Sequence, residues 1–422
     1  MVKSKKHAQE PNRTIVAGLD IGTSKVAAVI GEVREGNSVL IIGTGLAPSR
    51  GFRQGVVIHF EEAVQSIRSV IQEAQLTAGV EMRDVYLGIA GDHIHSVNSR
   101  GVVAVSNAGQ AVTEEDRERV LHAARAIALP GDRKVIHAIP QEYIVNNQGG
   151  VKDPVGLAGV RLEAEVHIVT CTAALAQNLI RAVEEAGLHV RSLVLEPLAS
   201  SYAVLEADDK KLGVVMLDIG GGTTDIAMFS GEAIRHTAVV PWGGQNVTND
   251  IAIGLKTSIE DAEDIKKRYG YCHASSMDGR EAFSTAPYGG RGHREISSEQ
   301  LLAIIQPRME EIFSLVRKEL RRSEYEPKTE AGVVLTGGGA LLRGVSDLAE
   351  EVFERPVRIG IPKPLGGLSE TVSSPIFATG MGLVLFGLES EQGGRVDEGD
   401  TLLPNKEGWR RLWNRFRNVF SS

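Results

Sequence analysis

Two distant stretches of the chain share one order of apolar and polar positions. They read "VAGLDIGTSKVAAVI" (16–30) and "VVMLDIGGGTTDIAMF" (214–229). Each has an apolar run, then Asp-Ile-Gly, then small and hydroxyl residues, then a second apolar run. Short apolar runs bounded by glycine are typical of buried strands. Each copy therefore predicts two strands joined by a tight turn.

Strands and helices are predicted to alternate along the rest of the chain. Apolar residues recur at helical spacing in segments 61–78, 173–186, 244–269, 298–323 and 373–388. Buried strands are predicted at 84–91 and 166–173, and a strand, a glycine turn and a helix follow one another at 331–353. The glycine-rich segment 284–297 is predicted to be an exposed loop. This alternation favours an α/β fold.

Residues 92–165 differ in sequence pattern from the segments around them. They hold strand-like runs on both sides of a helix that is predicted to begin near Thr113. Asp116 follows Thr113 by three residues, which is the spacing of a helix-capping pair. We interpret this stretch as an inserted α/β subdomain.

Composition limits the classes of protein that the chain can be. With 422 residues, more than one domain is expected. The formal net charge of −8 argues against general nucleic-acid binding. Only two cysteines occur, Cys171 and Cys272, so a disulfide framework is excluded and a reducing compartment is favoured. The polar residues 1–13 do not resemble a signal peptide and are interpreted as a disordered lead. No apolar run in the sequence is long enough to span a bilayer as a helix.

The glycine turns have the composition of phosphate-binding loops. Gly22, and Gly220 with Gly221 and Gly222, would leave bare N–H groups that can bind phosphate oxygens. Hydroxyl donors and one cation accompany them: Thr23, Ser24, Thr223, Thr224 and Lys25. Asp20 and Asp218 would repel phosphate unless a cation intervened, so each suggests Mg²⁺ held mainly through water. The alternative is two ordinary hairpins. A P-loop and the dinucleotide-binding pattern are both absent from the sequence.

These motifs resemble those of the actin, Hsp70 and sugar-kinase superfamily. More narrowly, residues 14–420 are similar to the bacterial cell-division family FtsA. The narrow resemblance is carried by "PQEYIV" (140–145), "DPVGLAGVRLEAEVHIVTC" (153–171), "LASSYAVL" (198–205), "IRHTAVVPWGG" (234–244) and the tryptophan-bearing tail.

The resemblance implies an actin-like two-lobed ATPase fold with an inserted α/β subdomain and a C-terminal amphipathic helix. It implies a first core of residues 14–83, 166–210 and 373–388, and an inserted subdomain of residues 84–165. It implies a second core of residues 211–236 and 331–372, a fourth subdomain of residues 237–330, a linker of residues 389–405 and a helix of residues 406–420.

ATP with Mg²⁺ is the ligand that the resemblance implies. The two Asp-Ile-Gly turns would hold the phosphates, and Gly337, Gly338 and Gly339 would contact the adenosine. Glu263 and Lys266 would reach the ribose and base, although an ordinary solvated pair three residues apart is an equal alternative. Glu196 would position the attacking water, unless with Pro197 it only ends a strand. Slow hydrolysis as a switch is favoured over metabolic turnover.

The tail "GWRRLWNRFRNVF" (408–420) has the pattern of a membrane-surface helix. Aromatic and arginine residues would occupy neighbouring faces of one helix, which attracts anionic lipids. The residues concerned are Trp409, Arg410, Arg411, Leu412, Trp413, Arg415, Phe416, Arg417 and Phe420. A terminal helix docked on the protein's own core is the alternative.

The resemblance also implies partners and a place in the cell. The C-terminal peptide of the tubulin-like FtsZ would dock near Arg291 and Arg294. The protein would polymerise on the cytoplasmic face of the inner membrane at the division septum, also binding anionic lipids. Later division proteins would then be recruited. A soluble superfamily ATPase, a small-molecule kinase and a pilus-assembly relative of the same fold are the alternatives.

Overall fold

The computed structural model describes residues 14–36, 38–106, 111–277, 282–285 and 294–391. The strands are β1 (Ile15–Ile21), β2 (Lys25–Arg34), β3 (Ser38–Pro48), β4 (Phe52–Arg53), β5 (Val56–Val57), β6 (Asp84–Ile89), β7 (His95–Ala104), β8 (Arg133–Val145), β9 (Gln148–Val151), β10 (Arg161–Thr172), β11 (His189–Leu195), β12 (Val214–Ile219), β13 (Thr224–Ser230), β14 (Ala233–Val240), β15 (Ala282–Thr285), β16 (Arg294–Ser297), β17 (Val333–Thr336) and β18 (Val357–Ile359). The helices are α1 (Phe60–Ala78), α2 (Glu114–Arg125), α3 (Ala173–Glu185), α4 (Glu196–Val204), α5 (Ala207–Leu212), α6 (Gly244–Leu255), α7 (Ile259–Tyr269), α8 (Ser298–Arg322), α9 (Val345–Phe353), α10 (Ser369–Val372) and α11 (Ala378–Glu391).

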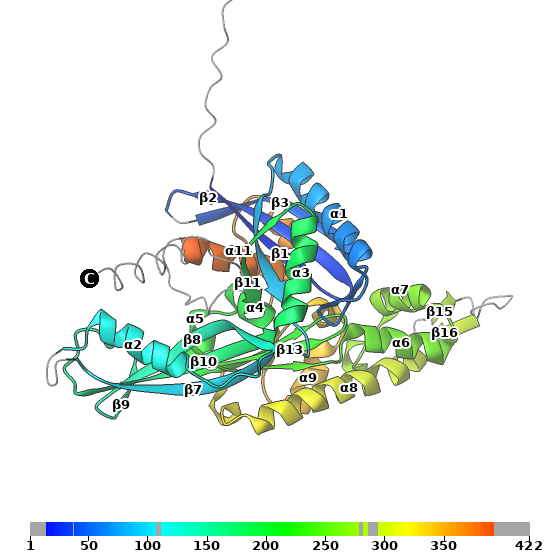
Figure 1. Cartoon of the computed structure of the whole chain (residues 1–422). Coiled ribbons are helices and arrows are strands. Elements are labelled where there is room, and N and C mark those ends of the chain that lie inside the picture. Colours follow the sequence, from blue (N-terminus) through cyan, green and yellow to red (C-terminus); the bar gives the residue numbers. More distant parts are fainter. Residues whose placement is uncertain (1–13, 37, 107–110, 278–281, 286–293, 392–422) are drawn as a thin grey trace, which may run out of the picture.

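Two sheets of the same design form the centres of two lobes (Figure 1). Within the described residues, the first sheet has the strand order β11-β6-β1-β2-β3 and the second has the order β14-β13-β12-β17-β18. In each, the hairpin that carries Asp-Ile-Gly is antiparallel, and its first strand is also paired in parallel with a later strand. The repeated sequence pattern thus produces a repeated sheet topology.

Helices cover these sheets because the strands are apolar on both faces. Strands β1 and β12 are buried almost throughout, which is typical of strands covered on both sides. Helices α1, α3 and α11 pack in the first lobe, whereas α6, α8 and α9 belong to the core of the second. The two apolar cores place the two glycine turns at the ends of rigid strands.

A third sheet, with the order β7-β10-β8-β9, lies beside the two lobes and carries α2 on one face (Figure 1). Helix α2 begins as expected, because Thr113 and Asp116 form a reciprocal capping box. Asp116 is fully buried, and its hydrogen bonds with Ser106, Arg119 and Thr113 outweigh burial and hold the pKa of its carboxyl well below the usual range. This cap ties the helix to the preceding strand.

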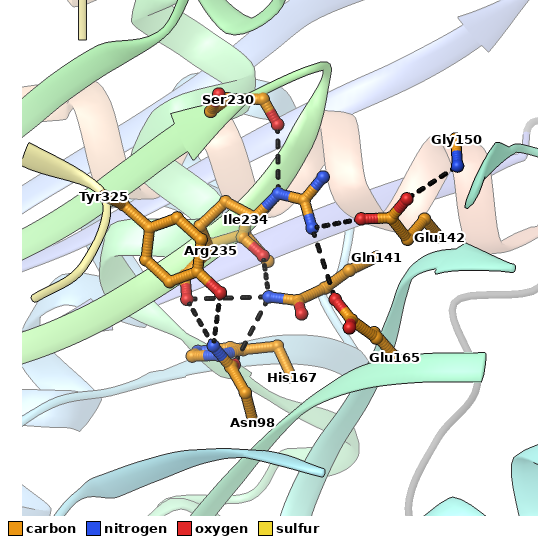
Figure 2. A network of polar contacts seen from close by, with 10 residues as sticks. All are labelled: Asn98, Gln141, Glu142, Gly150, Glu165, His167, Ser230, Ile234, Arg235 and Tyr325. Carbon is orange, nitrogen blue, oxygen red and sulfur yellow. Dashed lines mark hydrogen bonds and ion pairs between the residues drawn. The ribbon is translucent and has the colours of Figure 1, made fainter. Parts of the chain in front are cut away.

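A buried polar network joins the third sheet to β14 of the second lobe (Figure 2). Gln141 Nε2 donates to the carbonyl of Ile234 at 2.7 Å, and Arg235 Nη1 lies 3.2 Å from Glu142 Oε1. His167 lies between Asn98 Oδ1, at 2.7 Å, and Thr237 Oγ1, at 3.0 Å. Burial lowers the pKa of His167 to about 3, so the ring is neutral in this contact.

The structure corrects the expected limits of the inserted segment. Strand β6, which we placed at the start of residues 84–165, pairs in parallel with both β1 and β11 and lies in the first sheet. Strand β10 runs to Thr172 and pairs with β7 and β8, so residues 166–172 lie in the third sheet. The apolar pattern identified both strands, but their neighbours depend on long-range pairing.

Four further expectations differ in detail. The helix predicted at 244–269 is two helices, α6 and α7, because Lys256 adopts a left-handed conformation with φ of 56°. Both ends of the expected loop 284–297 belong to strands β15 and β16, which pair antiparallel, whereas residues 286–293 lie outside the described residues. The boundary expected at residue 236 cuts β14, which continues to Val240. Helix α11, which was predicted at 373–388, begins at Ala378 and ends at Glu391. Residues 389–391 of the expected linker 389–405 are therefore helical.

No helix in the described part of the chain combines the length and the apolar character needed to cross a membrane. The expected lead of residues 1–13 and the expected helix of residues 406–420 lie outside the described residues.

Candidate nucleotide site

The two glycine turns lie against each other across the boundary between the lobes. Gly22 N donates to Lys25 O at 2.9 Å in the first turn, and Gly220 N donates to Thr223 O at 2.9 Å in the second. The expectation of bare N–H groups at Gly22 and Gly220 was therefore wrong, because each N–H closes its own turn. A Cβ added at Gly221 would lie 2.0 Å from Ser24 Oγ, and one added at Gly222 would lie 2.5 Å from Thr23 Oγ1. A larger residue at either position would have to displace the hydroxyl of Ser24 or of Thr23. The structure therefore brings together the two turns that the sequence singled out.

The start of α6 fixes the orientation of the second turn. Gly244 N donates to Gly220 O at 2.9 Å and Gln245 N donates to Gly221 O at 2.8 Å. These carbonyls are therefore directed at α6. Within the described residues, the N–H groups of Gly221 and Gly222 have no protein acceptor. Unpaired N–H groups on a glycine turn are suited to anionic oxygens.

Two of the expected carboxylates lie under these turns. Asp20 accepts a hydrogen bond from Lys25 Nζ at 2.7 Å. Asp218 is 8% exposed, and Asp20 is 4% exposed. Lys25, which we expected to contact phosphates, is thus already paired with the first aspartate and remains close to the turn.

Asp225 adds a third carboxylate that supports the second turn. It accepts a hydrogen bond from Thr223 Oγ1 at 3.1 Å through Oδ2. Its other oxygen, Oδ1, is buried and has no hydrogen-bond partner among the described residues. Burial, and then the charge of Asp218, raise the pKa of Asp225 to about 8.

The site therefore concentrates buried carboxyl groups, and a bound cation would favour their ionised forms. Burial is also the main cause that raises the pKa of Asp218. Desolvation of its carboxyl, followed by the charges of Asp20, Asp225 and Asp218, raises the pKa of Glu196 well above its usual range. A buried carboxylate with an unpartnered oxygen fits a divalent ion bound through water. No group of three or more His, Cys, Asp or Glu side chains in the described part of the chain forms a direct metal cage.

Glu196 is the first residue of α4, immediately after β11 ends at Leu195. Pro197 lies in the first turn of α4, where proline is favoured because the N–H there has no helical partner. A Cβ added at Gly88 would lie 3.2 Å from Glu196 Oε1, so the carboxyl lies against the bare backbone of β6. Electrostatic coupling to Asp20, Asp225 and Asp218 puts Glu196 in the same cluster.

The third glycine turn lies against the second. Gly337 has φ of 80°, and a Cβ added there would lie 2.3 Å from Asp218 Oδ1. A Cβ at Gly339 would lie 2.2 Å from Ile219 Cγ2. Residues 338–341 form a short 3-10 helix rather than starting α9 directly. Glycine at 337 and 339 therefore lets the third turn pack directly against Asp218 and Ile219.

The expected pair on α7 lies behind the second turn. Lys266 Nζ is 2.7 Å from Glu263 Oε2, and it also donates to Thr248 Oγ1 at 2.8 Å and to Gly244 O at 3.1 Å. Burial, partly offset by Glu263, lowers the pKa of Lys266. The pair is half-buried and bound to α6, so it is more than a solvated surface pair.

Three residues near the turns escaped the sequence analysis. Gln54 N donates to Thr23 Oγ1 at 3.2 Å, while its side chain donates to Pro241 O of the other lobe at 3.1 Å. Ser200 and Thr379 both hydrogen-bond Asp218. A serine or threonine in an apolar segment carries no local signal that it approaches a distant aspartate.

Of the residues expected to bind a partner or the membrane, only Arg294 lies in the described part of the chain. Arg294 is exposed at the start of β16, whereas Arg291 and the tail residues from Trp409 to Phe420 lie outside the described residues. A pocket of about 650 Å³ lies elsewhere, between α2, β8 and α4, with Arg117, Tyr143 and Tyr202 in its lining.

Known proteins resemble the chain along most of its length. The family model for the cell division protein FtsA matches residues 215–382, and the model for the SHS2 domain inserted in FtsA matches residues 91–170. The cell division protein FtsA of Pseudomonas aeruginosa is 48% identical over 380 residues, which cover 90% of this chain and 91% of that protein. The chain belongs to the FtsA family of cell division proteins. The SHS2 match begins after β6, in agreement with the position of that strand in the first sheet.

Other FtsA proteins match over nearly the whole chain. FtsA of Escherichia coli strain K12 is 40% identical over 417 residues, covering 97% of this chain and 99% of its own length. FtsA of Neisseria meningitidis serogroup B is 44% identical over 376 residues, covering 89% and 90% respectively. The family assignment therefore includes both lobes and the inserted subdomain.

Solved structures place this FtsA-family chain in the actin-like α/β fold. MreB5 of Spiroplasma citri bound to ADP superposes with a TM-score of 0.56 at 17% identity, covering 91% of this chain and all of that one. The PilM–PilN type IV pilus biogenesis complex gives a TM-score of 0.65 at 20% identity, covering 89% and 98%. At such low identity these structures establish the fold alone.

Proposed function

We propose that this FtsA-family protein binds Mg²⁺–ATP between its lobes. The observation that carries the proposal is the contact of the two glycine turns, Gly221 against Ser24 and Gly222 against Thr23, above buried carboxylates. The unpaired N–H groups of the second turn would hold phosphate oxygens. Asp20 and Asp218 would hold the water shell of Mg²⁺, which supplies charge neutralisation between phosphates and carboxylates.

The remaining site residues would bind and orient the ligand. The hydroxyls of Thr23, Ser24, Thr223 and Thr224 lie on or beside the turns, and Lys25 lies next to Asp20. Gly337, Gly338 and Gly339 would lie along the adenosine, and Glu263 with Lys266 would support its ribose side. Glu196 would accept a proton from, or orient, the water that attacks the terminal phosphate.

Equilibrium ATP binding tests this proposal. A fluorescent ATP analogue titrated against the full chain in Mg²⁺ should bind at one site, and unlabelled ATP should displace it. Asp218→Asn should weaken the binding in Mg²⁺ more than Asp208→Asn, which removes the charge of an exposed carboxylate on α5. Failure of ATP to bind the wild-type chain would overturn the proposed site.

We further propose that the protein polymerises on the cytoplasmic face of the inner membrane at the septum and tethers the FtsZ ring. Family membership supports a role in division. The tail from Trp409 to Phe420 supports the membrane part, since its aromatic and arginine residues suit an interface with anionic lipids. Filament formation would multiply weak lipid binding by each tail through avidity. Later division proteins would then be recruited to this assembly.

Lipid binding can be tested with vesicles that contain anionic phospholipid. The full chain should co-sediment with them, whereas a chain ending at residue 404 and the Trp409→Ala, Trp413→Ala variant should remain in solution. Equal sedimentation of all three proteins would contradict a membrane role for the tail. A soluble ATPase or small-molecule kinase would predict no sedimentation of any of them.

FtsZ binding can be tested with its C-terminal peptide. Arg291→Glu with Arg294→Glu should reduce capture of the full chain by the immobilised peptide. Arg83→Glu with Lys211→Glu, at exposed positions on other parts of the molecule, should leave capture unchanged. Equal loss in both double variants would indicate a general charge effect and would remove these two arginines from the proposed site.

A further inference from the structure

Two buried hydroxyl groups outside the glycine turns converge on one oxygen of Asp218. Ser200 Oγ donates to Asp218 Oδ2 at 2.7 Å, and Thr379 Oγ1 donates to the same oxygen at 3.3 Å. The two hydroxyl oxygens are themselves 3.1 Å apart. Ser200 has no exposed surface, and Thr379 is 6% exposed. Oδ2 is therefore held by the protein, and Oδ1 is the oxygen beside the bare backbone of Gly337.

The two hydroxyls come from two helices that touch. Ser200 lies in α4 and Thr379 lies at the start of α11. A Cβ added at Gly382 would lie 1.8 Å from the carbonyl oxygen of Ala199, so the bare backbone of α11 rests on α4 at this point. This close approach brings Thr379 within hydrogen-bonding distance of Ser200.

Helix α4 also carries the candidate water-positioning group. Glu196 is its first residue and Ser200 follows four residues later, so both side chains belong to one face of the helix. The electrostatic coupling of Glu196 to Asp218 agrees with this placement. One short helix thus contributes to both the carboxylate cluster and the support of Asp218.

A carboxylate that binds a cation through water needs a fixed orientation. Groups that hydrogen-bond to a metal-binding side chain hold it in place, and their loss typically lowers metal affinity about 10- to 100-fold. A carboxylate whose oxygen loses a buried hydroxyl donor is also left with an unmet hydrogen bond. The Ser200–Thr379 arrangement meets the description of such a support.

We propose that Ser200 and Thr379 are positioning residues that orient Asp218 toward the hydrated magnesium ion. The inference rests on the proposed Mg²⁺–ATP function and adds two residues to that site. Neither hydroxyl contacts the nucleotide in this account. Their effect is exerted through Asp218, and it should therefore show in the magnesium dependence of binding.

The chain offers a matched control in Ser201. Its hydroxyl is equally buried and lies on the same helix, but it donates to the carbonyl of Leu198 at 2.7 Å instead of to Asp218. Ser200→Ala and Ser201→Ala therefore remove the same atom from neighbouring positions. Thr379→Val keeps the shape of the side chain without its hydroxyl, and Thr379→Ser keeps the hydroxyl.

The experiment measures binding of a fluorescent ATP analogue to the full chain as Mg²⁺ is titrated, and again in excess EDTA. We expect Ser200→Ala to raise the Mg²⁺ concentration at half-maximal binding about tenfold. Thr379→Val should raise it about threefold, in line with its longer hydrogen bond. Ser201→Ala and Thr379→Ser should match the wild type, and affinity in EDTA should be the same for all.

Each result decides the question. An unchanged magnesium midpoint in Ser200→Ala, or an equal shift in Ser201→Ala, would overturn the inference while leaving the nucleotide site intact. If Ser200→Ala does not fold, as judged by thermal melting, the comparison of Thr379→Val with Thr379→Ser decides in its place. A wild-type chain that binds no nucleotide at any Mg²⁺ concentration would overturn the proposed function and this inference with it.

Discussion

Gly221 and Ser24 belong to different lobes, yet a Cβ at Gly221 would lie 2.0 Å from Ser24 Oγ. This contact is the point at which the two repeated turns meet. It makes the spacing between the turns sensitive to any group added at Gly221, which would first have to displace the Ser24 hydroxyl. A ligand held by both turns would experience any change in that spacing.

Gly221→Ala should therefore weaken ATP binding about tenfold, because the added methyl group takes the position of the Ser24 hydroxyl and displaces it from the place where the two turns meet. The matched control is Gly131→Ala, where a Cβ meets no atom within 4 Å. Equilibrium binding of a fluorescent ATP analogue measures both variants. Equal affinities for Gly221→Ala and the wild type would show that the turns do not share a ligand.

The raised pKa of Asp225 predicts a specific pH dependence of stability. The folded protein keeps this proton to about pH 8, whereas the unfolded chain releases it near the ordinary value of 3.8. The unfolded state thus binds fewer protons between these values, and the free energy of unfolding falls as the pH rises through them. The contribution of Asp225 to the free energy of unfolding is complete below its unfolded pKa of 3.8 and is lost above its folded pKa of about 8. The largest slope is about 1.4 kcal/mol per pH unit.

Asp225→Asn should flatten this dependence in the ligand-free protein, since the amide does not titrate. Melting temperatures at several pH values from 5 to 8.5 measure the effect, and Asp208→Asn serves as the control at a surface carboxylate. A variant that keeps the full wild-type slope would place the titration on another group.

Glu196→Gln should separate binding from hydrolysis. The amide keeps the shape of the side chain but cannot accept a proton, so phosphate release should fall at least about tenfold while ATP affinity changes less than about threefold. The amide does not titrate, so Glu196→Gln should also remove the part of the pH dependence of stability that the raised pKa of Glu196 produces in the ligand-free protein. Unchanged phosphate release would show that Glu196 has no role in hydrolysis.

Gly382→Ala should lower stability by about 2 kcal/mol or more, because its Cβ would overlap the backbone of α4. Gly380→Ala on the same helix is a milder change, since its nearest neighbour would be a side-chain carbon of Val29 at 3.0 Å. Differential scanning calorimetry of the two variants gives the comparison. Equal melting temperatures would mean that α11 can shift away from α4 without cost.

Much of the local structure could be predicted from the sequence. Short-range signals were sufficient for the hairpins at Asp20 and Asp218, because an apolar run that ends in glycine defines a strand and its turn within about ten residues. The cap at Thr113 depends on a partner three residues away and was likewise predictable.

The neighbours of these elements required the folded chain. Strand β6 has the same buried pattern wherever it pairs, so its place beside β1 followed only from tertiary structure. The break at Lys256 depends on one left-handed residue that has no strong local signature.

The sequence alone singled out the candidate residues of the site, because glycine, aspartate and hydroxyl side chains stand next to one another in each turn. Tertiary structure alone decided which of them meet. The contact of Gly221 with Ser24, the bridge from Gln54 to Pro241 and the hydroxyls of Ser200 and Thr379 on Asp218 all join segments far apart in the chain. Such contacts depend on how the two apolar cores pack, and that packing involves residues from the whole chain. A sequence motif involves only neighbouring residues, so it does not reveal these contacts.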